Sequence, residues 1–95
     1  MGIAALARAY ALAGKREEAK KRLAELLELS KQRYVSPGSI GLIYAALGDK
    51  DQAFTWLDKA VEAYDLVTAR LKVDSRFDPL RSDPRFPDLV RRVGL

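Results

Sequence analysis

The residue types that most often perform chemistry are scarce in this 95-residue chain. It contains no His and no Cys, so the commonest general base and the thiolate nucleophile are both missing. Its serines fall at expected helix caps, turns or helix faces, and none has a base at a recognisable spacing. We therefore expect a protein that is not an enzyme and that holds no cofactor and no metal.

The C-terminal third contains the two charged groupings that could suggest chemistry. Four aspartates could form a carboxylate cluster, but two of them precede a proline, which is typical of helix N-caps: Asp74, Asp78, Asp83 and Asp88. Seven Lys and Arg residues with Phe77 and Phe86 could contact nucleic acid. The aspartates alternate with these cations and weaken the attraction to phosphate, so nucleic acid remains an unlikely partner.

Composition favours a single folded, cytoplasmic domain over residues 1–95. Hydrophobic residues make up 48% and charged residues 32% of the chain, which separates it from disordered sequences. No apolar run approaches the roughly 20 residues that cross a bilayer, and we expect no signal peptide and no membrane partner.

The elements of the fold follow from an internal repeat. Four pairs of residues recur 34 positions apart, at equivalent places in two helical patterns: Tyr10 and Tyr44, Gly14 and Gly48, Ala19 and Ala53, Leu23 and Leu57. A fixed period near 34 is typical of stacked helical hairpins. The first hairpin is predicted over residues 1–33, with an N-terminally truncated first helix, and the second over 34–65.

Local signals place the helices. The predicted spans are Ile3 to about Ala13, Arg16 onward, Pro37–Leu47 and about Lys50–Tyr64, with Gly14 and Gly48 ending the first and third. Gly41 occupies the position where two packed helices cross most closely. Trp56 lies beside the buried stripe of the fourth helix and is expected to receive whatever packs next.

After Tyr64 the residue pattern no longer repeats, and residues 66–95 are predicted to form a terminal cap. We expect a fifth helix over residues 66–72, then turns over 74–81 with at most one helical turn at Pro79. A last short helix follows Asp83-Pro84 and ends at Gly94. The predicted fold is therefore an all-α solenoid of two hairpins plus a fifth helix and a short C-terminal capping helix.

The two copies resemble tetratricopeptide repeats. The second matches at Ile40, Gly41, Tyr44, Gly48, Ala53, Leu57 and Ala60, and the first at Leu6, Ala7, Tyr10, Gly14, Ala19 and Leu23. The closing proline of that pattern is replaced by Lys31 and Asp65. The tail LKVDSRFDPLRSDPRF resembles the C-terminal end of such regions in large bacterial signalling proteins, which implies that the chain is a fragment of a longer one.

The resemblance implies a protein–protein interaction module that binds a peptide or partner helix in a concave groove. Its groove positions fall on Arg8, Leu12, Ser39, Leu42, Ala45 and Ala46. The family's two-carboxylate clamp for chaperone C-termini is not matched, because its Lys and Asn places are occupied by Ala4, Arg8 and Ser39. A shallow, mostly apolar groove with Arg8 at one end remains.

Self-association is the second prediction. If no repeat precedes the first hairpin, an apolar edge is left uncovered at Ile3, Leu6, Leu26 and Leu27, and two copies could pair there as a homodimer. An engineered or purely structural helical scaffold without a ligand is the alternative, since an apolar helix face serves both purposes.

Overall fold

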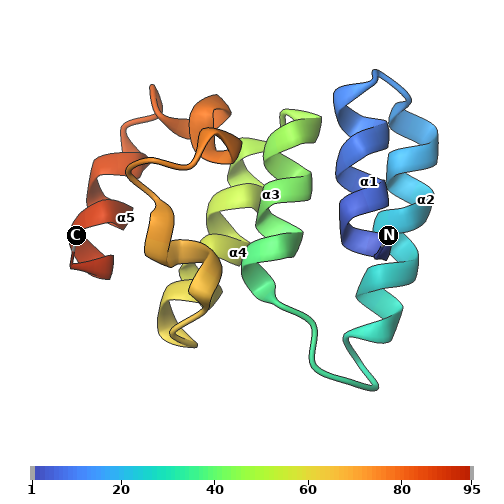
Figure 1. The fold of residues 1–95 in the computed structure, drawn as a ribbon, viewed down its shortest axis with the longest axis horizontal. Coiled ribbons are helices and arrows are strands. Elements are labelled where there is room, and N and C mark those ends of the chain that lie inside the picture. The colour runs from blue at the N-terminus through green and yellow to red at the C-terminus, as the bar shows by residue number, and fades with distance from the viewer. Residues whose placement is uncertain (1, 95) are drawn as a thin grey trace.

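The protein, described here by a computed structural model over residues 2–94, is built from five α-helices and two 3₁₀ helices (Figure 1). No strand occurs in this range, so the predicted all-α class is confirmed. The helices pack as consecutive hairpins along the long axis, with the N-terminal hairpin at one end and α5 at the other.

The first hairpin consists of α1 (Ile3–Leu12) and α2 (Arg16–Leu29). Gly14 turns the chain between them at φ +79°, a backbone conformation that glycine adopts without steric cost. Ala7 and Ala19 are completely buried, so two small side chains allow the helices to approach closely.

The second hairpin consists of α3 (Pro37–Leu47) and α4 (Lys50–Glu62). Ser36 and Asp49 cap the two helices by accepting hydrogen bonds from the backbone N–H of Ser39 and Gln52. A Cβ on Gly41 would lie 3.0 Å from Leu57 Cγ and 3.2 Å from the carbonyl oxygen of Ala53, so the predicted close crossing is present. Helix α4 ends two residues before the predicted Tyr64.

The remaining chain covers the second hairpin. It forms the 3₁₀ helices η1 (Leu66–Arg70) and η2 (Ser75–Leu80), followed by α5 (Arg85–Val93). The predicted fifth α-helix is wrong in type, and the predicted turns after Asp74 are a six-residue 3₁₀ helix. Capping by Asp78 is also wrong, because Asp74 caps η2 and Asp78 lies within it.

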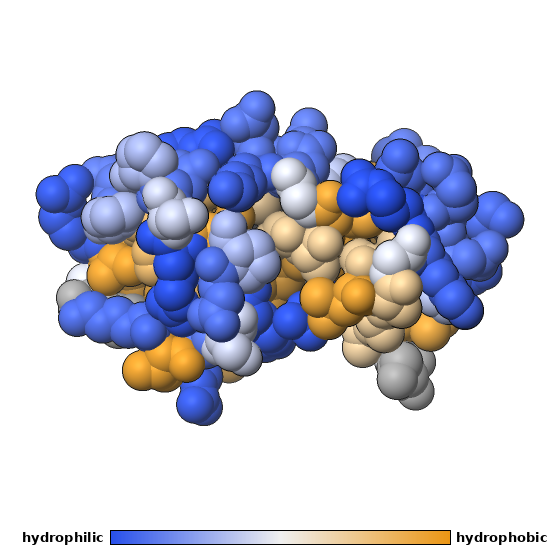
Figure 2. All heavy atoms as spheres, turned by 90° about the horizontal axis from the view of Figure 1, so that it is seen from above, coloured by the Kyte–Doolittle hydropathy of each residue, from blue (hydrophilic) through white to orange (hydrophobic). Residues whose placement is uncertain are grey.

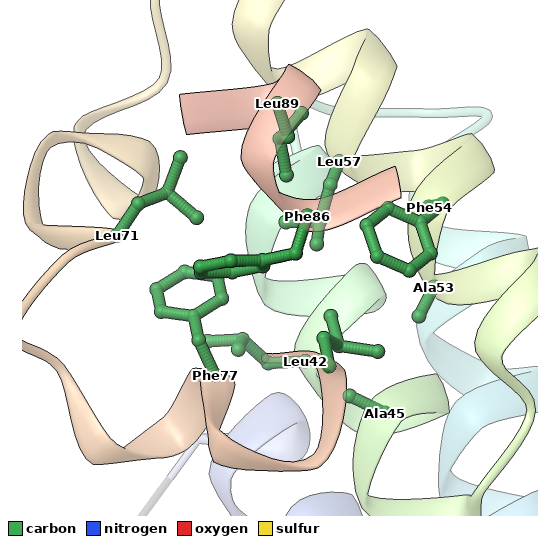
Figure 3. Close-up of a cluster of buried hydrophobic side chains, with 10 residues drawn as sticks. Leu42, Ala45, Ala53, Phe54, Leu57, Leu71, Phe77, Phe86 and Leu89 are labelled. Carbon is green, nitrogen blue, oxygen red and sulfur yellow. The ribbon is translucent and has the colours of Figure 1, made fainter. Parts of the chain in front are cut away.

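The core has two clusters on either side of the second hairpin. One lies between the first and second hairpins and contains Ala7, Leu23, Leu26, Ile40, Ile43 and Leu47, among others. The other lies between the second hairpin and the tail, where Phe77 and Phe86 pack on Leu42, Ala45 and Leu57 (Figure 3). Tyr44 contacts both clusters and so joins them.

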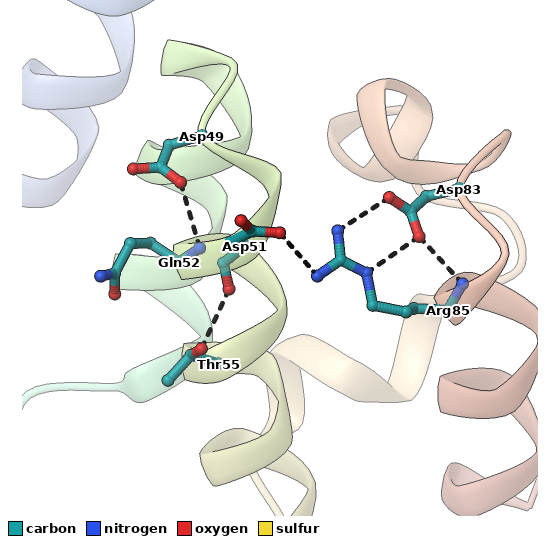
Figure 4. A network of polar contacts seen from close by, with 6 residues as sticks. All are labelled: Asp49, Asp51, Gln52, Thr55, Asp83 and Arg85. Atoms are coloured by element: carbon teal, nitrogen blue, oxygen red, sulfur yellow. Dashed lines mark hydrogen bonds and ion pairs between the residues drawn. The ribbon is translucent and has the colours of Figure 1, made fainter.

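Helices α4 and α5 lie side by side in a register of 34 residues. Arg85 Nη1 donates to Asp51 Oδ1 at 2.9 Å (Figure 4), and Arg92 Nη1 donates to Asp58 Oδ1, each across a separation of 34. Because both partners advance by seven residues, the two helices run parallel. The residue pattern fails after Tyr64 as predicted, but the packing keeps the period.

Trp56 corrects a further prediction. Its ring packs against the cluster between the first and second hairpins, toward the preceding hairpin and not toward the following segment. Lys59 Nζ lies 4.2 Å from the centre of the ring, a cation–π contact on its outer side.

Candidate partner-binding site

A hollow of about 310 Å³ opens where α1, α3 and η2 meet. Its walls come from small residues of α1, from Ser39 and Leu42 of α3, and from Arg76 of η2; the full lining is Gly2, Ala4, Ala5, Arg8, Ser39, Leu42 and Arg76. Leu42 is only 2% exposed and forms an apolar floor. Three segments far apart in the sequence therefore build one concave surface.

Arg8 contributes an unused hydrogen-bond donor to this surface. The residue is half-buried, and its Nε is buried without a hydrogen-bond partner among residues 2–94. A buried donor of a charged group that lacks a partner is costly, so this atom favours an acceptor from outside the described chain.

Arg76 is held at the rim by Asp74. Its Nε and Nη2 donate to the Asp74 carboxylate at 3.0 Å and 2.6 Å, and its backbone N–H donates to the same group at 2.9 Å. The side-chain hydrogen bond from Arg76, followed by the backbone one, lowers the pKa of Asp74 to about 2. The guanidinium is thus fixed in place and stays charged, and its side chain is 41% exposed.

The position of α3 relative to the tail depends on Asp65. Its Oδ2 accepts from Ser36 Oγ at 2.6 Å and from the Gly38 N–H at 3.0 Å, while its Oδ1 accepts from the Val67 N–H. Burial acts to raise the pKa of Asp65, but these hydrogen bonds outweigh it, and the pKa lies below its usual value. One carboxylate therefore caps both α3 and η1.

Gly38 makes this junction possible. A Cβ there would lie 2.6 Å from Cβ of Val67, which no real contact tolerates. The N-terminus of α3 can therefore approach η1 only without a side chain at position 38.

The predicted groove residues are only partly brought together. Arg8, Ser39 and Leu42 line the hollow. Leu12 is 60% exposed but does not line it, and Ala46 packs toward the first hairpin. Ala45 corrects the prediction, because it is 2% exposed beneath the tail and cannot reach a ligand. The tail fills the part of the groove that α3 alone would leave open.

The residues predicted for self-association also differ in exposure. Ile3, Leu6 and Leu27 are half-buried, whereas Leu26 is 5% exposed in the core, so its predicted exposure is wrong. Apolar and small side chains do reach the surface around the N-terminal hairpin and its junction with α3, as Figure 2 shows from above. The exposed ones on α1 include Ala5, Ala9 and Leu12.

Arg76 is the residue of the hollow that sequence reasoning missed. The repeat appeared to end before it, so nothing assigned it to the groove. The spacing Asp74-x-Arg76 was an available signal, because an aspartate at a cap often fixes an arginine two residues later through its carboxylate.

Two classes of function find no support in the described residues. Among residues 2–94, no group of three His, Cys, Asp or Glu side chains could hold a metal ion. Within the same range, no helix has the length and apolar character that crossing a bilayer requires.

Residues 38–65 match the family model of the tetratricopeptide repeat. The match covers α3 and α4 up to Asp65, the hairpin that forms one wall of the hollow. This repeat is typical of non-catalytic protein–protein interaction modules and suggests protein partners in general. No curated protein and no solved structure matches the chain. The assignment of the first hairpin to the same family, and the likeness of the tail to signalling proteins, remain predictions.

Proposed function

We propose that this protein is a non-catalytic interaction module that binds a segment of a partner protein in the hollow between α1, α3 and η2. The observation that carries the proposal is the buried Nε of Arg8, which has no partner among residues 2–94 and lies on a concave surface. The tetratricopeptide repeat at residues 38–65 supports the same general role.

The lining favours a particular kind of segment. Ala4, Ala5 and Leu42 offer apolar contact without large side chains, so the backbone of a ligand can approach closely. Arg8 and Arg76 add two cationic groups, and guanidinium groups pair well with carboxylates. We therefore expect the bound segment to combine a small apolar side chain with an acidic residue.

Fluorescence anisotropy with three labelled 12-residue peptides tests this proposal. The peptides share an apolar centre and carry two Glu, two Gln or two Lys residues. We expect the Glu peptide to bind most tightly and Arg8→Gln to weaken it by about tenfold, the effect of losing one charge-assisted contact. Arg33→Gln is the matched control, because Arg33 is an exposed arginine in the loop before α3. Equal binding of all three peptides, or an unchanged affinity in Arg8→Gln, would disprove the proposal.

Self-association through the first hairpin is a second candidate. Leu12 is 60% exposed on α1, whereas Ala46 and Leu80, which follow it at intervals of 34 residues, pack into the two core clusters. A second copy covering this face would make a homodimer. Sedimentation velocity at high micromolar concentration should then show a dimer that Leu12→Glu converts to a monomer; a monomer in the unchanged protein would eliminate this candidate.

Nucleic-acid contact through the tail has weaker support. Five tail arginines already pair with carboxylates: Arg76, Arg81, Arg85, Arg91 and Arg92. An oligonucleotide would have to compete with these aspartates for every cation. A scaffold without a ligand is the outcome if neither the peptides nor a second copy binds.

A further inference from the structure

A second concave surface lies between α4 and α5, apart from the hollow described above. This socket has a volume of about 360 Å³ and an apolar floor made by Phe54 and Leu89, with Pro84 at its edge. The Arg85–Asp51 and Arg92–Asp58 ion pairs cross between the helices two turns apart, about 10 Å along the axis. They frame the socket at its two ends.

The edge of the Arg85 guanidinium is already occupied. Nε and Nη2 donate to the two carboxylate oxygens of Asp83 at 3.0 Å and 2.9 Å, and Nη1 donates to Asp51 at 2.9 Å (Figure 4). These bonds lie in the plane of the group and fix its orientation. The side-chain hydrogen bonds to Asp83 and then to Asp51 hold the pKa of Arg85 above its usual value.

The two faces of the same group are in different environments. The guanidinium carbon lies 4.5 Å from the centre of the Phe54 ring, so one face stacks on an aromatic floor. The side chain is nevertheless 46% exposed. With its edge hydrogen-bonded and one face covered, the opposite face is the part open to solvent.

We propose that this socket binds an aromatic side chain of a partner protein, which stacks on the open face of Arg85. The π-face of an aromatic ring is negative and attracts a cation placed over it, and a guanidinium can stack on two rings at once. Leu89 and Pro84 supply apolar contact for the edge of the ring.

The surroundings disfavour other occupants. An anion would meet the carboxylates of Asp51, Asp58 and Asp83, which already take the in-plane donors of Arg85 and Arg92. A cation would meet the two arginines themselves. A neutral planar group avoids both repulsions and uses the one surface that is not hydrogen-bonded.

An NMR titration of the whole chain with N-acetyl-tryptophanamide tests the proposal. We expect saturable shifts at the Arg85 Nε–H and at Leu89, with a Kd of roughly 1–10 mM, as is usual for a fragment of this size. The cyclohexylalanine analogue has a similar apolar bulk and no π-face, so it should bind at least about fivefold more weakly.

Two variants refine the test. Arg85→Lys keeps the charge but removes the planar surface, and it should weaken binding about fivefold. Arg91→Lys is the control on the same helix, because Arg91 pairs with Asp88 outside the socket and should leave binding unchanged. Absence of saturation, equal binding of the cyclohexyl analogue, equal binding by Arg85→Lys, or shifts centred on Arg8 would each overturn the proposal. The analogue comparison uses the unchanged protein and remains decisive if Arg85→Lys folds poorly.

Discussion

The two junctions of the molecule use the same repeat positions with different residues. At the first junction, α3 and α4 pack on the first hairpin through Ile43, Ala46 and Trp56. At the second, the positions 34 residues later are Phe77, Leu80 and Val90, and these pack the tail on the second hairpin. The comparison shows that the places of buried contact persist after the motif residues and the α-helical backbone have been lost.

The change of backbone has a local cause. Pro79 lacks an N–H and disfavours α-helical geometry at Asp78, so a regular helix is penalised there. Phe77 and Leu80 are three residues apart, one turn of a 3₁₀ helix, and this geometry points both side chains the same way. A short 3₁₀ helix therefore presents to the core the face that a third α-helical repeat would have presented.

The largest expected effect is at the centre of the second junction. Phe77 is completely buried and packs against Phe86, so Phe77→Ala should lower the free energy of unfolding by about 3–5 kcal/mol. Ile43→Ala should cost about 2–5 kcal/mol at the equivalent place of the first junction. Urea unfolding followed by circular dichroism measures both.

Tyr34→Ala serves as the control for these two variants. Tyr34 is 77% exposed, and its loss should change stability by less than about 0.5 kcal/mol. If Phe77→Ala were as mild as this control, the tail would not be a structural equivalent of a repeat.

The next effect separates two glycines of α3. Gly38→Ala places a Cβ 2.6 Å from Val67 Cβ at the second junction, and it should destabilise by about 1–3 kcal/mol. Gly41→Ala meets Leu57 Cγ at 3.0 Å, a side chain that can shift, and the gain in helix propensity of about 1 kcal/mol offsets part of the strain. Thermal melts should therefore rank Gly38→Ala below Gly41→Ala; the reverse order would mean that η1 yields more readily than α4.

The sequence predicted the first junction far better than the second. Tyr, Gly and Ala at intervals of 34 residues indicated two hairpins, and the all-α class followed from them. The tail was harder, because its register is carried by Arg85 and Arg92 pairing with Asp51 and Asp58, and charges on two separate helices show no residue identity. Periodicity detects repeated residue types and misses complementary ones.

The same limit explains the candidate sites. Arg8 and Ser39 were found because they lie at equivalent repeat positions, whereas Arg76 was missed because the repeat seemed to have ended. Ala45 was misplaced because its burial depends on Phe77, which was not yet known to occupy the groove. The socket beside Arg85 depends on the packing of α5 on α4, and local sequence contains no information on that contact.

A smaller effect distinguishes the junctions by pH. The carboxylates whose pKa is lowered in the described residues are Asp65, Asp74 and Asp83, and all three lie in or contact the second junction. A carboxylate with a lowered folded-state pKa stabilises above its unfolded pKa of about 3.9, and this contribution is lost as pH falls through the folded value. For Asp74 the window runs from about pH 4 to about 2.

Asp74→Asn should flatten the loss of stability in this window. The measurement is urea unfolding at pH 7, 4, 3 and 2. Glu28→Gln is the control, because Glu28 is an exposed acid of the first hairpin, 71% exposed, and it should leave the slope unchanged. An identical slope in Asp74→Asn would show that acid destabilisation originates elsewhere.

The smallest effect concerns the ion pairs that reveal the register. Asp58 and Arg92 are 51% and 38% exposed, and pairs of this kind contribute roughly 0–1 kcal/mol. A double-mutant cycle with Asp58→Ala and Arg92→Ala should give a coupling energy below about 1 kcal/mol, falling further in 1 M salt. The register is then set by Phe86 and Leu89 in the core, and the ion pairs record it without determining it. A coupling energy above 2 kcal/mol would reverse that order and make the charges the reason why α5 stacks in step with α4.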